Sequence, residues 1–143
     1  MRLPFVLAVF CLFVQPLYAQ TVPGATDALN SFRAQSNQAT LTVSTKLQTM
    51  AERHARDMAK RGYFSHTGRD GSDIGDRAER VSYGYCALAE NIAKGQRSLS
   101  EVMQAWAGSA GHRKNMLNAQ VTEFGLARGT GDVWVMVLGR DGC

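Results

Sequence analysis

The strongest hydrophobic pattern in the chain runs from residue 46 to residue 61, where the less polar positions recur every three or four residues. Such a stripe is typical of an amphipathic α-helix that buries one face. Ser44 is a suitable N-cap for this helix, and Gly62 is a suitable stop at its C-terminal end. The positions on the stripe are Leu47, Met50, Ala51, His54, Ala55, Met58 and Ala59.

Shorter helices are predicted on both sides of this segment. Residues 26–37 carry two apolar side chains at helical spacing and predict a short helix. Residues 68–80 indicate a polar loop followed by another short helix, for which Ser72 or Asp73 would be the N-cap.

A further helix is predicted over residues 98–106, because Ser98 and Glu101 have the spacing of a capping box. Glycines at positions 108 and 111 should end this helix, so residues 112–117 are expected to add one further turn. The apolar positions that we expect to be buried are Val102, Met103 and Trp106.

The hydrophobic period changes near the C-terminal end of the chain. Residues 122–128 and 132–140 predict two strands, joined by the turn-forming sequence GTGD. The second strand is apolar on both faces, which is typical of a strand that lies between two layers. Helices account for most of the rest, so we expect an α+β fold with helices on both faces of a small, mainly antiparallel sheet.

Residues 1–19 have the features of a secretory signal peptide. Arg2 precedes an apolar run over residues 3–14, and the small residue Ala19 precedes polar sequence. The run is too short for a comfortable membrane span, and no second apolar stretch is long enough to cross a bilayer. We therefore expect cleavage near Ala19 and one exported domain over residues 20–143.

Export changes how the cysteines are interpreted. Cys11 should leave with the signal peptide, so that Cys86 and Cys143 remain. An even number of cysteines in an oxidising compartment predicts one disulfide, and two free thiols are the alternative. The formal net charge of +4 is mild and no basic run is interleaved with aromatics, so a nucleic-acid partner is not expected.

Three residues able to do chemistry stand in polar or glycine-containing segments: His66, Glu90 and His112. We expect each of them to follow or open an element, where side chains point into clefts. Gly111 precedes His112 and allows a close backbone approach. His54, in contrast, lies on the apolar stripe, so it is expected to be a core histidine held by one or two hydrogen bonds.

Residues 53–72, 84–95 and 102–117 carry the sequences RHARDMAKRGYFSHTGRDGS, GYCALAENIAKG and VMQAWAGSAGHRKNML. Together they resemble the CAP superfamily of cysteine-rich secretory, antigen 5 and pathogenesis-related 1 proteins, and most closely its compact bacterial SCP-like branch. The resemblance extends from about residue 29 to residue 139. It implies an α-β-α sandwich, in agreement with the periodicity.

The resemblance also implies a central cavity with two histidines and two acidic residues, which in several members binds a divalent metal. The matching positions here are His66, Glu90 and His112, while Ser109 stands where the second acid would be. A metal such as zinc would then be bound by the two histidines, with Glu90 as a ligand directly or through water. The alternative is a polar cluster in which Glu90 accepts hydrogen bonds from the histidines or nearby backbone.

The leading functional hypothesis is a monomeric, secreted binding module, extracellular or periplasmic, with a lipid, glycan or protein ligand. A hydrolase is the first alternative, either metal-assisted or with Ser109 as nucleophile, His112 as base and Glu90 as orienter. A structural or adhesive exported domain is the second alternative. Catalysis is not the leading expectation, because the chain contains no GxSxG sequence.

Overall fold

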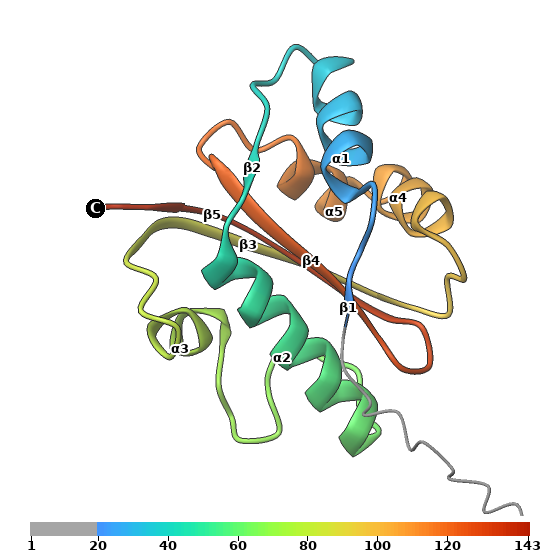
Figure 1. Ribbon diagram of the computed structural model, residues 1–143, viewed down its shortest axis with the longest axis vertical. Helices are drawn as coiled ribbons and strands as arrows, with labels where there is room; N and C mark the ends of the chain where they lie inside the picture. Colours follow the sequence, from blue (N-terminus) through green and yellow to red (C-terminus); the bar gives the residue numbers. More distant parts are fainter. Residues whose placement is uncertain (1–19) are drawn as a thin grey trace, which may run out of the picture.

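A five-stranded sheet separates two layers of helices in the computed structural model, which describes residues 20–143 (Figure 1). The expected signal peptide, residues 1–19, lies outside the described residues. The elements follow one another in this order: β1 (Gln20–Thr21), α1 (Ala25–Ala34), β2 (Thr42–Val43), α2 (Thr45–Arg61), α3 (Ile74–Glu79), β3 (Tyr85–Lys94), α4 (Leu99–Gly108), α5 (Ala110–Met116), β4 (Glu123–Gly129) and β5 (Val133–Asp141).

The strand order is β1-β4-β5-β3, with β2 pairing additionally with β4. The pairing of β2 with β4 is parallel, and the other three pairings are antiparallel. Figure 1 shows α2 and α3 on one side of this sheet and α1, α4 and α5 on the other. The predicted α+β class, with a mainly antiparallel sheet between helical layers, is therefore confirmed.

The strand β5 has a separate hydrophobic core on each face. Trp134, Met136 and Leu138 pack with residues of α1, α4 and α5. The alternate residues Val133, Val135 and Val137 pack with residues of α2 and α3. Burial on both faces explains why this strand is apolar at every position from 133 to 138, and it confirms the prediction that the strand lies between two layers.

The helix ends agree with the predicted caps. The long helix α2 ends at Gly62, whose φ of 65° is in the left-handed region that glycine adopts readily. Asp73 and Asp76 form a reciprocal capping box at the start of α3. The side chain of Ser98 accepts a hydrogen bond from the backbone N–H of Glu101 at the start of α4. The segment after α4 forms the separate helix α5, longer than the single turn that was expected.

The helix α2 is held close to β4 by a glycine and an amide. A Cβ atom at Gly125 would collide with the backbone of Leu47 and Gln48, so only glycine allows this approach. The side chain of Gln48 accepts from the backbone N–H of Leu126 at 3.0 Å and donates to its carbonyl at 3.1 Å. This pairing fills the interval on β4 between β2 and β1, and it fixes the position of α2 over the sheet.

The strand β3 is the main element that the sequence pattern did not predict. Its central residues, ALAENIA, neither alternate in polarity nor contain many β-branched side chains. It nevertheless pairs with β5 along its whole length, from Tyr85 to Lys94. The expectation that Glu90 follows or opens an element was wrong, because Glu90 lies inside this strand. Pairing with β5 overrides the weak local preference of the segment.

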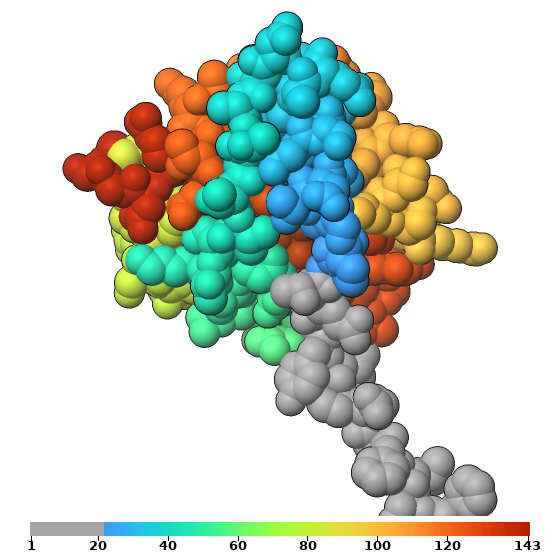
Figure 2. Space-filling view, turned by 45° about the horizontal axis from the view of Figure 1, so that its top comes forward, coloured from blue at the N-terminus to red at the C-terminus, as the bar shows by residue number. Residues whose placement is uncertain are grey.

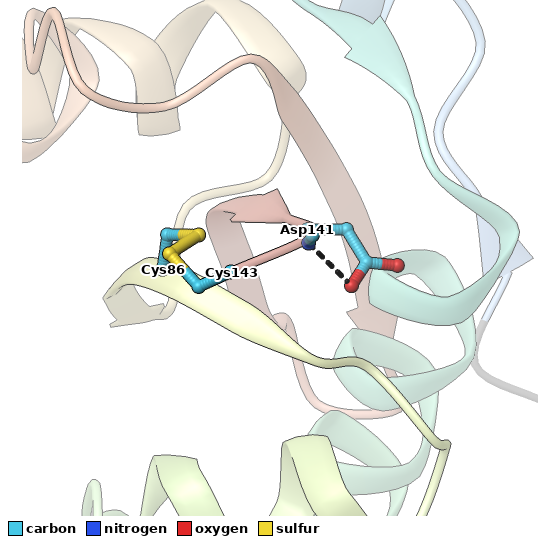
Figure 3. The surroundings of a disulfide bond; sticks show 4 residues. Cys86, Asp141 and Cys143 are labelled. Carbon is cyan, nitrogen blue, oxygen red and sulfur yellow. Dashed lines mark hydrogen bonds between the residues drawn. A yellow bond between two sulfur atoms is a disulfide. The ribbon is translucent and has the colours of Figure 1, made fainter.

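The predicted disulfide between Cys86 and Cys143 is present and ties the C-terminus to the beginning of β3 (Figure 3). The two Cα atoms are 5.1 Å apart, and the bond spans 57 residues of sequence. In Figure 2 the C-terminal segment, in dark red, stands at the left edge of the molecule, where the disulfide holds it. Closure of a loop of this length stabilises the fold by about 4 kcal/mol in the chain-entropy model.

Candidate functional site

Glu90 is the centre of a polar cluster on the α2–α3 face of the sheet. It lies opposite Val137 of β5, whose side chain belongs to the core on that face. Its side chain is only 3% exposed. Oε1 lies 2.8 Å from Nδ1 of His66 and 3.9 Å from Nε2 of His54, and Oε2 lies 2.8 Å from Nη2 of Arg77. We call these four residues the Glu90 cluster.

Arg77 of α3 supplies the positive charge that the buried carboxylate requires. Its side chain is 8% exposed, and its Nη1 also donates to the carbonyls of His66 at 2.9 Å and Ser72 at 3.1 Å. A buried carboxylate without such a cation would carry a large desolvation penalty. Sequence reasoning missed Arg77. Even if a cation had been expected near Glu90, the sequence could not have shown which of the 16 lysines and arginines supplies it.

His66 lies in the loop between α2 and α3 and connects the buried carboxylate with solvent, because its side chain is 57% exposed. A carboxylate only accepts hydrogen bonds, so Nδ1 of His66 carries the proton and donates it to Glu90. In the neutral ring the lone pair of Nε2 is then free to bind a ligand. The hydrogen bond to Glu90 raises the pKa of His66 above its ordinary value, and partial burial opposes this effect.

His54 is the buried histidine of α2, with an exposure of 2%. Its Nε2 donates to the carbonyl of Ser65 at 3.0 Å, so this ring holds the loop that carries His66. Burial lowers the pKa of His54. The expectation of a core histidine held by one or two hydrogen bonds is confirmed, and the structure adds that the ring belongs to the Glu90 cluster.

His112 lies on α5, in the other helical layer, and its backbone contacts β3 at Asn91, the residue next to Glu90. Its carbonyl accepts a hydrogen bond from Nδ2 of Asn91 at 3.1 Å. Asn115 donates to Oδ1 of Asn91 at 2.9 Å and to the carbonyl of Glu90 at 3.3 Å. Burial lowers the pKa of His112, and the charge of His66 lowers it further.

Ser109 occupies the junction of α4 and α5 and is the N-cap residue of α5, with φ −103° and ψ 121°. Its carbonyl accepts from the backbone N–H of Arg113 at 2.8 Å, but its hydroxyl makes no capping hydrogen bond. Among residues 20–143 no hydrogen bond joins the side chains of Ser109 and His112, or those of His112 and Glu90. The structure therefore brings His66 and Glu90 into direct contact, with His112 nearby.

The arrangement offers few ligands to a metal ion. In the described part of the chain, no group of three or more His, Cys, Asp or Glu side chains is placed to hold one. Both carboxylate oxygens of Glu90 are already engaged, by His66 and Arg77. The groups that remain for an external ligand are the outer nitrogen of His66 and the ring of His112.

Comparison with known proteins identifies the family. The sequence profile of the cysteine-rich secretory protein family, CAP, matches residues 26–138. The chain belongs to the CAP family. Its CAP domain is 33% identical over 109 residues to the protein YkwD of Bacillus subtilis, covering 76% of this chain and 42% of YkwD. It is 30% identical over 100 residues to the Bacillus subtilis membrane protein YlbC, covering 70% of this chain and 29% of YlbC. The chain thus spans less than half the length of these relatives.

Solved structures agree with this assignment. An extracellular protein of Bacillus anthracis that contains an SCP domain superimposes with a TM-score of 0.79 at 30% identity, over 84% of this chain and 40% of that one. An outer surface protein of Borrelia burgdorferi gives a TM-score of 0.75 at 18% identity, over 87% of this chain and 99% of that one. At 18% identity, the similarity to the Borrelia burgdorferi protein is evidence for the fold only.

Proposed function

We propose that this CAP domain is an exported binding module whose ligand site is the edge of β3 between His66 and His112. Export is supported by the signal-like composition of residues 1–19 and by the Cys86–Cys143 disulfide, a bond that persists in oxidising compartments. The solved Bacillus anthracis relative is described as extracellular. The site of action is then outside the cell or in the envelope.

The ligand chemistry that this edge fits best is a divalent metal ion such as zinc, bound through imidazole nitrogens. The observation that carries the proposal is the 2.8 Å hydrogen bond between Glu90 and Nδ1 of His66. A carboxylate in this position fixes the tautomer of a metal-binding histidine and raises its basicity. We therefore assign Glu90 to orienting His66, and the metal ligands to His66 and His112.

The donor set fits an open site with two protein ligands, and it does not fit a closed one. Structural zinc sites have four protein ligands, and catalytic ones have three. Ser109 contributes no carboxylate at the position where the family resemblance implies a second acid. An ion held by two imidazoles would offer its open positions to donor groups of a lipid, glycan or protein ligand. The affinity for the metal alone should be modest.

The serine hydrolase alternative gains no support from the contacts. It requires Ser109 to donate to His112 and His112 to donate to Glu90. Within residues 20–143 neither hydrogen bond is formed, and Glu90 is bonded to His66 instead. A purely structural role for the Glu90 cluster is a separate alternative, and it predicts that the protein binds no metal. The binding experiment therefore decides between a structural role and a metal site.

Calorimetry of the purified, untagged protein with zinc chloride at pH 7.5 and pH 5.5 tests the proposal. His66→Ala and His112→Ala should each abolish binding, and the lower pH should weaken it, because imidazoles must be neutral to ligate. Ser109→Glu should strengthen binding by adding a carboxylate. Its matched control is Gln104→Glu, which adds the same charge at an exposed position of α4.

Two results would contradict the proposal. Unchanged binding in both histidine variants would place the metal elsewhere. Absence of binding in every variant, Ser109→Glu included, would leave the Glu90 cluster as a structural feature.

A further inference from the structure

A second candidate site lies behind the Glu90 cluster, between α2, the loop before α3, and α3. It is a pocket of about 340 Å³, near the lower limit for pockets that bind small molecules. Six of its lining residues are cations: Arg53, Arg56, Lys60, Arg61, Arg77 and Arg80. Two are acids, Asp57 and Asp70. We call it the basic pocket.

The ion pairs inside the pocket leave several positive charges uncompensated. Arg61 pairs with Asp57 at 2.8 Å, and Arg80 pairs with Asp70 at 2.7 Å. These two pairs use both acids of the lining.

The remaining cations divide into one buried and three exposed side chains. Arg77 is paired with Glu90, which belongs to the neighbouring cluster. The other three are Arg53, Arg56 and Lys60 on α2, which are exposed. Among residues 20–143 they have no salt bridge within 4.0 Å and no side-chain hydrogen bond. Three like charges from one helix are thus gathered at a single concave surface, where low-dielectric walls focus their field.

The buried side of the pocket provides an independent observation. Arg77 lines the pocket, yet its Nε–H has no hydrogen-bond partner among the described residues, although this atom is inaccessible to solvent. Buried donors without a partner are rare in native structures. A ligand in the pocket reaches this donor only if the side chain of Arg77 moves, so the free cations of α2 carry the argument for an anion.

We propose that the basic pocket binds a small phosphate-bearing anion. Guanidinium groups match the geometry of phosphate oxygens and bind them bidentately, and a lysine adds a point charge. Three free cations suit a ligand with two or three negative charges. The phosphate can belong to a soluble ester or to a lipid headgroup, and the experiment separates these sources. The basic pocket shares Arg77 and His54 with the Glu90 cluster, but the three free cations on which the proposal rests make no contact with Glu90.

The decisive variant is Arg56→Gln with Lys60→Gln, which removes two free charges without touching the Glu90 cluster. Its matched control is Arg97→Gln with Lys114→Gln, which lowers the net charge equally at exposed positions outside the pocket. Sodium pyrophosphate is titrated into each protein by calorimetry at pH 7.5 and low ionic strength. The pocket variant should lose at least about tenfold in affinity and the control should lose little, since hydrogen bonds to charged groups are the stronger kind.

Vesicles of phosphatidylglycerol form the second arm of the experiment. If pyrophosphate and vesicles both bind and both are lost in the pocket variant, the proposal holds and the source is a headgroup. Binding of pyrophosphate alone supports the proposal with a soluble phosphate. Vesicle binding without pyrophosphate binding would overturn the proposal, because the vesicles would then bind through the general positive charge of the surface and not through the pocket. Failure to bind either probe, or equal losses in the control, would also overturn it.

Thermal melting checks that the variants are folded. The substituted side chains are exposed and have no described partners, so the melting temperatures should match the parent protein. Arg53→Gln tests the same pocket with a single substitution if the double variant does not fold. A normal pyrophosphate affinity in a folded Arg53→Gln protein and in the folded double variant would refute the proposal.

Discussion

Glu90 and Asn91 are adjacent residues of β3, and both are buried and polar. Their side chains lie on opposite faces of the sheet and find different kinds of hydrogen-bond partner there. Glu90 points to the α2–α3 face, where a cation and a histidine bind its carboxylate. Asn91 lies opposite Met136 of β5 and points to the other face. There it contacts only neutral groups, the carbonyl of His112 and the amide of Asn115.

The difference separates two tasks within one strand. On the charged side, the contribution to stability depends on the protonation state of the groups and on the presence of each partner, because an unpaired buried charge is costly. The hydrogen bonds of Asn91 on the neutral side involve no titrating group, and they hold α5, with Ser109 and His112, against the edge strand. One face therefore sets the electrostatics of the candidate site, and the other sets its geometry.

The largest expected effect comes from breaking the charged side. Arg77→Met should lower the free energy of unfolding by about 3–5 kcal/mol, because it leaves the carboxylate of Glu90 buried without its cation. Denaturant unfolding measures this loss. The variant should also raise the pKa of His66, which the charge of Arg77 now lowers. A proton NMR titration of the ring follows that shift.

Two further variants control this experiment. Arg80→Gln removes an arginine of an exposed ion pair in the lining of the basic pocket, and it should cause no measurable loss of the free energy of unfolding. Arg77→Met combined with Glu90→Leu removes both charges and should recover part of the stability. A double variant no more stable than Arg77→Met alone would show that the pair matters through packing and not through charge.

A smaller effect is expected from the neutral side. Asn91→Ala removes the hydrogen bond to the carbonyl of His112 and leaves the amide of Asn115 with only its longer bond to the carbonyl of Glu90, and should lower the free energy of unfolding by about 2 kcal/mol. The pKa of His66 should stay unchanged, since no charge is removed. A shift of that pKa comparable with the shift in Arg77→Met would show that the two faces are not separate.

Local patterns in the sequence were sufficient to predict much of this fold. The helix α2 combines an apolar stripe with a glycine stop, and β5 is apolar at six consecutive positions because each of its faces has a core. Caps and turns depend on neighbouring residues, so Ser98 was identified from its spacing to Glu101, and the cap of α3 was narrowed to Ser72 or Asp73, of which the structure shows Asp73. The position of Ser109 between two helices followed from the glycines around it.

The features that could not be predicted depend on contacts between distant residues. The strand β3 owes its conformation to pairing with β5, which follows it by about 40 residues (133 minus 94 is 39). Since β3 was not predicted, the burial of Glu90 could not be derived, and neither could its need for Arg77. His54 was identified as buried because its neighbours on α2 are apolar, but its distance of 3.9 Å from Glu90 depends on the tertiary fold.

The smallest effect concerns pH and distinguishes the histidines without changing the sequence. The pKa of His66 should lie above the ordinary value of 6.5, because Glu90 accepts a hydrogen bond from its ring. The pKa values of His54 and His112 should lie below 6.5, because burial disfavours their charged forms. Proton NMR of the three ring resonances measures this order directly.

The signs for stability follow from these shifts. The additional stability that the charged form of His66 gains from Glu90 is fully present below pH 6.5 and is lost as the pH rises through the raised pKa of His66, while the neutral ring keeps the hydrogen bond from Nδ1 to Glu90. His54 and His112 act in the opposite direction, since the unfolded chain takes up protons below about pH 6.5 that the folded rings resist. Any metal bound at the edge of β3 should meet competition from protons at His66 first, and at His112 only at lower pH. A titration in which His66 loses its proton at or below the pH of His112 would show that the bond to Glu90 is not formed in solution, and the proposed orientation of His66 for ligand binding would fail with it.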